Sequence, residues 1–107
     1  MRRVLLICGA GMSSSMMAKK TTEYFQENGH DIEMTAVGVP EGKKTILSGA
    51  NYDLYLISPQ VRMEFKEMKK AADKMGNRIA QVPPQAYVPI PSGIKNMANL
   101  CLDNLDD

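Results

Sequence analysis

The sequence contains little of what several common protein functions require. Among its 107 residues there are two cysteines, Cys8 and Cys101, and one histidine, His30. Two cysteines are too few for a disulfide scaffold, and without a Cys-x-x-Cys pair or a second histidine they do not make a zinc site. We therefore expect no bound metal and no cofactor.

An excess of charge and a long apolar run are also missing. The formal net charge is +1, which gives no general attraction to nucleic acid or to an anionic membrane. No apolar run approaches the ~20 residues that cross a bilayer, and the one that follows Arg2 and Arg3 is too short for a signal peptide. We expect a cytoplasmic protein that does not itself span a membrane, with one domain over residues 1–107.

The most informative segment lies near the beginning of the chain. Residues 4–7 are apolar and typical of a strand that is buried on both faces, and Cys8 follows them. Residues 9–11 form a small-residue turn, and the serines at 13–15 can cap a helix. Backbone N–H groups and the positive end of a helix dipole then surround a pocket for an anion. This setting favours the thiolate of Cys8, which is its nucleophilic form.

The rest of the chain alternates between strand and helix patterns. We predict strands over residues 3–8, 31–39, 52–58 and 78–82, and helices over residues 13–28, 40–47, 59–75 and 92–105. The third helix has an apolar stripe formed by Val61, Phe65, Met68, Ala72 and Met75. Four strand–helix units in succession predict an α/β fold, a parallel sheet with helices on both faces.

Three segments are expected to meet where the strands of this sheet end. Ligands bind at the carboxyl ends of parallel strands, and Cys8, Ser58-Pro59-Gln60 and the loop with Tyr87 all follow strands. His30 falls at the far end of the first helix, ~20 Å away, and we interpret it as a surface turn residue. Cys101 belongs to the apolar stripe of the last helix, which predicts a core position.

Other interpretations of the first segment have less support. A buried structural cysteine does not account for the small-residue turn and the serines. A dinucleotide site would need a third glycine, where Ser14 stands, and an acidic residue after the second strand. A cysteine phosphatase of the low-molecular-weight type would have an arginine in place of Ser14 to clamp the phosphate, and an acid in residues 83–91. A phosphate pocket without these hydrolytic groups favours a carrier, and the phosphatase-like hydrolase remains the alternative.

The chain resembles the enzyme IIB component of the phosphoenolpyruvate-dependent sugar phosphotransferase system, of the lactose/cellobiose (chitobiose) type. The resemblance depends on Cys8-x-Ala10-Gly11-Met12-Ser13-x-Ser15 after the first strand, on Ser58-Pro59-Gln60 and on Tyr87. It implies a three-layer sandwich whose four-stranded parallel sheet has helices on both faces, similar to the low-molecular-weight tyrosine phosphatase and flavodoxin-like arrangement. In this family serine and threonine often stand where this chain has Gly9 and Ser14.

The resemblance also implies a function. Cys8 is expected to accept a phosphoryl group from a phosphohistidine of a IIA component and to pass it to a sugar bound to the membrane IIC component. That sugar is expected to be a β-disaccharide of the cellobiose or lactose kind. The protein is then a phosphotransferase that works as a monomer and stays transiently at the inner face of the membrane.

Site residues follow from the loop and the resemblance together. The expected phosphate-binding residues are Gly9, Ala10, Gly11, Met12, Ser13, Ser14 and Ser15, and the expected partner-docking residues are Met12, Met16, Pro59, Gln60 and Tyr87. Some roles stay open at this point: Ser14 is a helix cap or a phosphate ligand, Tyr87 covers the sulfur or packs the loop, and at least one of Met16 and Met17 is in the core.

Overall fold

The structure is a computed structural model that describes residues 1–9 and 12–105. Its strands are β1 (Arg2–Cys8), β2 (Ile32–Gly38), β3 (Leu54–Ile57) and β4 (Ile79–Gln81). Its α-helices are α1 (Met12–Glu27), α2 (Val39–Leu47), α3 (Phe65–Lys74) and α4 (Pro91–Leu105), and two 3-10 helices are η1 (Pro59–Glu64) and η2 (Pro84–Ala86). Each strand and helix that the sequence predicts is present, and most ends agree within two or three residues.

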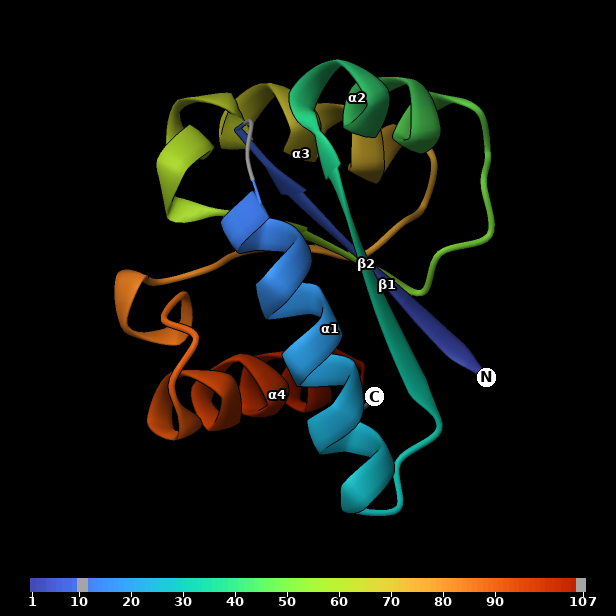
Figure 1. Cartoon of the computed structure of the whole chain (residues 1–107). Helices are drawn as coiled ribbons and strands as arrows, with labels where there is room; N and C mark the ends of the chain where they lie inside the picture. The colour runs from blue at the N-terminus through green and yellow to red at the C-terminus, as the bar shows by residue number, and fades with distance from the viewer. Residues whose placement is uncertain (10–11, 106–107) are drawn as a thin grey trace.

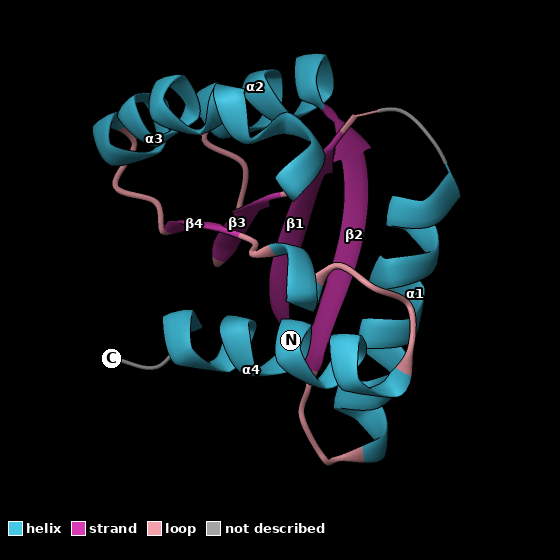
Figure 2. Cartoon of the chain, turned by 90° about the vertical axis from the view of Figure 1, so that its left-hand side faces the viewer, coloured by secondary structure: helices cyan, strands magenta, loops and turns pink. Residues whose placement is uncertain are grey.

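The strands form a four-stranded sheet in the order β2-β1-β3-β4, and every neighbouring pair is parallel. The chain goes from β1 through α1 to β2 on one side (Figure 1), and returns to the other side of β1 for β3 (Figure 2). The order therefore reverses at β1, and the carboxyl end of β1 is the switch point where such sheets bind ligands. The predicted four-stranded parallel sheet is confirmed, and its switch point coincides with Cys8.

Helices cover both faces of the sheet, so the predicted three-layer sandwich is also confirmed. Figure 2 shows α2 and α3 on one face, with α1 and α4 on the other. Consecutive residues of β1 contribute to the two faces in turn: Leu6 packs in the cluster with α1 and α4, and Ile7 packs in the cluster with α2 and α3. Residues 4–8 are at most 3% exposed, as expected for a strand that is covered on both sides.

The helix predicted over residues 59–75 is not continuous. The chain makes the 3-10 helix η1 first, and Val61 has non-helical angles (φ −123°, ψ 32°) before α3 begins at Phe65. The break follows from how the segment leaves the sheet, because the N–H of Val61 donates to the carbonyl of Ser58 and closes a tight turn. The predicted stripe is buried at Met68 and Ala72, whereas Met75 is 39% exposed because α3 has already ended at Lys74. The buried part of the predicted stripe therefore ends before Met75.

Two interpretations of single residues are confirmed. His30 is exposed in the turn after α1, at the end of the helix away from Cys8, and its ring meets Phe25 edge to face at a centroid distance of 6.1 Å. Cys101 is completely buried on α4, and this burial raises the pKa of its thiol to about 12. A thiol with so high a pKa stays protonated and unreactive near neutral pH.

Candidate functional site

Cys8 ends β1 at the carboxyl edge of the sheet, where it is paired in register with Gly38 of β2. Its side chain is turned toward β2, and the thiol donates a hydrogen bond to the carbonyl oxygen of Val37 at 3.2 Å. Only 3% of the residue is exposed. A cysteine that is this well buried can react only if a neighbouring cavity lets another molecule reach its sulfur.

Such a cavity lies next to the sulfur. A hollow of ≈ 270 Å³ is lined by Cys8, Gly9, Ser14, Ser15, Ala36, Val37 and Gly38. This volume is ample for a phosphoryl group, which adds four heavy atoms to the sulfur. Part of the wall comes from the predicted loop, and part comes from the end of β2. The thiol is therefore covered by protein but not sealed in the interior.

The β2 side of the hollow was not predicted from the sequence. Small residues at the end of the second strand, Ala36 and Gly38, were the available signal, since they leave room beside a neighbouring strand. A side chain at position 38 would place its Cβ 3.7 Å from the carbonyl oxygen of Gly9. The pairing of β1 with β2 converts this small-residue strand end into one wall of the site.

The other wall is the first turn of α1, which begins directly above the hollow. The positive end of the helix dipole at this turn favours an anion there. Ser14 is buried, with 4% exposed, and Ser15 is exposed at the rim. Ala10 and Gly11 lie outside the described residues, as do the side chains of Met12 and Ser13. The phosphate-binding roles of all seven predicted residues, from Gly9 to Ser15, stay predictions.

The segment that follows β3 reaches the same loop from the opposite side. The N–H of Ser58 donates to the carbonyl of Ile7 at 2.9 Å, which fixes the start of η1 against the strand that carries Cys8. Gln60 is exposed, and its Oε1 lies 3.7 Å from the position that a Cβ on Gly9 would take. The structure thus brings the predicted residues Pro59 and Gln60 to the border of the cysteine loop.

The remaining predicted docking residues have different surroundings. Met16 is 48% exposed on α1, whereas Met17 is 1% exposed in the core, so one of the two is a core residue as predicted. Tyr87 follows η2 and is half-buried against the core cluster of α1 and α4. This packing supports the interpretation that Tyr87 holds its loop in place.

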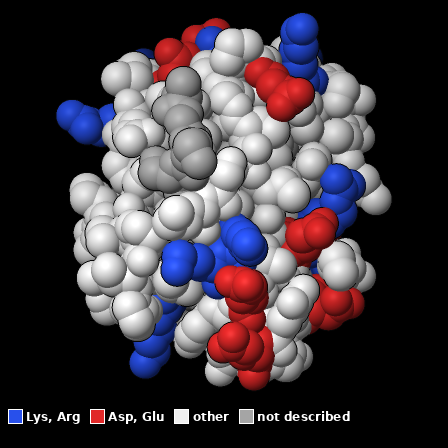
Figure 3. Space-filling model, in the orientation of Figure 1, with Lys and Arg blue, Asp and Glu red and all other residues white. Residues whose placement is uncertain are grey.

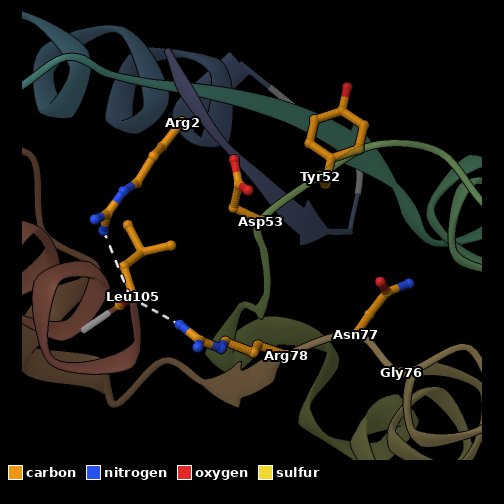
Figure 4. Close-up of a pocket in the computed structure, with 7 residues that line it drawn as sticks. All are labelled: Arg2, Tyr52, Asp53, Gly76, Asn77, Arg78 and Leu105. Carbon is orange, nitrogen blue, oxygen red and sulfur yellow. Dashed lines mark hydrogen bonds between the residues drawn. The ribbon is translucent and has the colours of Figure 1, made fainter. Parts of the chain in front are cut away.

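A second hollow, of ≈ 360 Å³, lies at the opposite, amino edge of the sheet (Figure 4). Arg78 donates to the carbonyl of Leu105 at 2.7 Å, and Arg2 approaches the same oxygen at 3.5 Å. Two guanidinium groups therefore stabilise the negative end of the α4 dipole. The chemistry of this hollow is structural, and it is separated from Cys8 by the length of β1.

Residues 1–9 and 12–105 lack two features that would indicate other functions. No three histidine, cysteine, aspartate or glutamate side chains in these ranges come together in a group that could hold a metal ion. None of the helices in these ranges combines the length and apolar character needed to cross a membrane.

Fold and site together define an α/β protein with a cysteine at the switch point of its sheet, beside a helix N-terminus. The comparison with sequence families then gives a specific assignment. Residues 3–98 match the family described as "PTS system, Lactose/Cellobiose specific IIB subunit". The chain belongs to this family, whose members are phosphotransferase components of sugar uptake.

Two related proteins support the assignment of the chain to this family. The chain is 33% identical over 87 residues to the oligo-beta-mannoside-specific EIIB component of Bacillus subtilis, a match that covers 81% of this chain and 82% of the relative. It is 28% identical over 85 residues to the lactose-specific EIICB component of Streptococcus mutans. That second match covers 79% of this chain but 14% of the relative, in which the IIB part is joined to a IIC part.

Solved structures show the same fold. The lactose-specific IIB domain from Streptococcus pneumoniae superposes with a TM-score of 0.82 and 20% identity, and the match covers 98% of both chains. The cellobiose-specific IIB component from Borrelia burgdorferi superposes with a TM-score of 0.72 and 21% identity, over 97% of this chain and 91% of that chain. The predicted fold class is thereby confirmed.

Proposed function

We propose that Cys8 is a phosphoryl carrier between a phosphohistidine of a IIA component and a sugar bound to a membrane IIC component. The observation that supports this most directly is the position of the thiol. It lines a hollow of ≈ 270 Å³ at the switch point of the sheet, in front of the first turn of α1. We expect a phosphoryl group on the sulfur to fit there, close to the positive end of the α1 dipole, which favours an anion.

The first transfer forms one bond and breaks another. The Cys8 thiolate attacks phosphorus in line, the S–P bond forms, and the P–N bond to the donor's imidazole breaks. The electron pair of the broken bond goes to the imidazole nitrogen of the donor. Backbone N–H groups of residues 9–15, together with the hydroxyls of Ser13, Ser14 or Ser15, hold the three equatorial oxygens.

The second transfer reverses the role of the sulfur. A sugar hydroxyl attacks phosphorus, the S–P bond breaks, and Cys8 leaves as a thiolate. The proton of the hydroxyl passes to a base of the acceptor complex. In this scheme the protein supplies positioning and a positive electrostatic potential, because phosphoryl transfer needs little other help from side chains.

The sugar class follows from the relatives. Their names specify oligo-β-mannosides and lactose. A β-glycosidic linkage is common to these sugars, which supports a β-disaccharide as the sugar of this protein. Two lactose-specific relatives join IIB and IIC in one chain, which supports a IIC partner for this protein as well. We expect the IIA donor to be a separate protein that arrives by diffusion.

Several further expectations belong to the same proposal. Residues 1–107 act as one domain, the protein works as a monomer in the cytoplasm, and it meets the membrane through IIC.

Mass spectrometry tests the carrier function. The protein is incubated with phosphoenolpyruvate, the general phosphotransferase proteins and a IIA component, and the modified residue is mapped. We expect one phosphoryl group on Cys8, no label in Cys8→Ser, and normal labelling in Cys101→Ser. Labelling that persists in Cys8→Ser would refute the proposal.

An aryl phosphate distinguishes the carrier from the phosphatase-like alternative. The hydrolase would need a charged clamp and a proton donor, but Ser14 stands at the clamp position and residues 83–91 contain no aspartate or glutamate. We therefore expect no steady release of phosphate. Multiple turnovers would favour the hydrolase.

A further inference from the structure

Another surface hollow lies at the same edge of the sheet as Cys8, because its lining includes residues that directly follow β3 and β4. It has a volume of ≈ 540 Å³ and lies between the η1–α3 segment and the η2 segment. In Figure 1 these segments are the yellow-green and orange parts at the left. The residues that line it are Pro59, Arg62, Met63, Phe65, Lys66, Gln81, Val82, Pro83 and Pro84. We call this hollow the proline groove.

The proline groove combines an apolar floor with a basic rim. Phe65, Val82 and the prolines form the floor, and Met63 stands at the edge with 72% of its surface exposed. Arg62 and Lys66 are its charged residues, and no described acidic residue lines it. An exposed surface of this kind is typical of a site for protein association.

The basic rim is not neutralised by its own segment. The acidic residues of the same segment, Glu64 and Glu67, lie 3.0 and 3.6 Å from Lys43 of α2. The hydrogen bond with Glu64 also raises the pKa of Lys43, which agrees with this pairing. Within residues 1–9 and 12–105, neither Arg62 nor Lys66 makes an ion pair. Two positive charges therefore face the groove without a counter-charge.

The groove is continuous with the border of the cysteine loop. Pro59 lines one end of it, and the next residue, Gln60, reaches Gly9 beside Cys8. Gln81 connects the two sides, because its Nε2 donates to the carbonyls of Ile57 at 2.9 Å and Val82 at 3.2 Å. A protein interface of ordinary size buries about 800 Å² on each partner, enough to cover the groove and the Cys8 hollow together.

From these observations we propose that the proline groove docks the phosphoryl donor, through a donor surface that pairs carboxylates with an apolar side chain. This inference depends on the proposed function. The donor is the partner whose chemistry fits the charge, because its phosphohistidine adds about two negative charges at the contact. A partner that arrives by diffusion also gains most from a steering charge, since rim charges act mainly on the association rate.

Charge reversal, measured with two phosphoryl donors, tests the groove. The variant Arg62→Glu/Lys66→Glu is compared with Lys44→Glu/Lys95→Glu, which makes the same charge change at exposed residues of α2 and α4 outside every hollow described here. We measure the rate of Cys8 labelling by the phosphorylated IIA protein and by phosphoramidate, a small P–N donor that needs no docking surface. Urea unfolding verifies that both variants are folded.

We expect the groove variant to be labelled by IIA at least tenfold more slowly than the control variant, and both variants to be labelled equally by phosphoramidate. The difference should shrink as salt is added, because the attraction is screened. A Met63→Ser variant should also slow labelling by IIA, with Met75→Ser as its matched control.

Three results would overturn the groove assignment. They are equal IIA rates in the groove and control variants, a slower phosphoramidate reaction in the groove variant, and a loss confined to the later transfer from Cys8 to sugar on IIC. Failure of the carrier function itself looks different, because the wild-type protein would then not be labelled at Cys8 by either donor.

Discussion

Gly93, near the start of α4, packs against the backbone of the loop that carries Tyr87. A methyl group at position 93 would lie 2.1 Å from the carbonyl oxygen of Val88 and 2.9 Å from its carbonyl carbon. Both are backbone atoms, so rotation of a side chain cannot relieve the contact. In Gly93→Ala the loop must therefore withdraw by more than about 1 Å to restore an ordinary contact distance.

The expected loss of stability has two parts of opposite sign. Overpacking against a fixed backbone costs about 3 kcal/mol, and replacing glycine by alanine inside a helix returns about 1 kcal/mol. The net loss is then about 2 kcal/mol, which for a chain of this size corresponds to a decrease in Tm of roughly 8–15 °C.

Urea and thermal unfolding measure this loss directly, with Asn99→Ala as the control at an exposed position of the same helix. The control should change the free energy of unfolding by less than about 0.5 kcal/mol. Labelling of Cys8 by a IIA component should also slow in Gly93→Ala, because the displaced loop is connected to the proline groove through η2. A Gly93→Ala protein as stable as the wild type would show that the loop moves freely, and the packing argument would be wrong.

Three other predictions concern the interior and the sheet. Between pH 9 and 12 the unfolded chain has released the Cys101 proton that the folded protein still holds. The free energy of unfolding should therefore fall as pH rises, with a slope approaching about 1.4 kcal/mol per pH unit. In Cys101→Ala this slope should be smaller, and an unchanged slope would contradict the raised pKa of the Cys101 thiol. Gln81→Glu replaces the amide donor that joins the ends of β3 and β4 by a carboxylate that faces carbonyl oxygens. Urea unfolding at pH 7 should show a loss of about 1–3 kcal/mol, and a smaller loss at an acidic pH where the carboxylate is protonated. Equal losses at the two pH values would contradict this role of the Gln81 amide. Gly42→Ala places a methyl group 2.8 Å from the Ile7 side chain and should destabilise the protein. Ile7→Val should partly restore the stability, with a coupling energy of about 1 kcal/mol in a double-mutant cycle. If the effects of the two substitutions on the free energy of unfolding simply add, the two positions are not in contact.

The parts of the fold that the sequence predicts well are those with a local signal. The apolar runs in β1 and β3 mark strands covered on both faces, and Met97, Cys101 and Leu105 mark the buried face of α4. The break at Val61 has no such signal, because the residues before and after it continue a helical spacing. At the break the N–H of Val61 donates to the carbonyl of Ser58, three residues earlier, and this 3-10 type of turn is not marked by the apolar spacing.

The site shows the same division between local and distant information. Cys8 and the first turn of α1 are adjacent in the chain, so the sequence indicates their shared role. Ala36, Val37 and Gly38 reach the hollow only through the pairing of β2 with β1. The proline groove likewise needs residues that are about twenty positions apart, and no spacing rule connects them.

The hydrogen bond from the Cys8 thiol to the Val37 oxygen, at 3.2 Å, has a consequence for every reaction at this sulfur. A thiol has a single proton to donate, and both ionisation and esterification remove it. After either change, an electron-rich sulfur faces an electron-rich carbonyl oxygen across the same short gap. Phosphorylation of Cys8 therefore breaks this hydrogen bond, and the carbonyl oxygen of Val37 needs another donor for as long as the phosphoryl group stays on the sulfur.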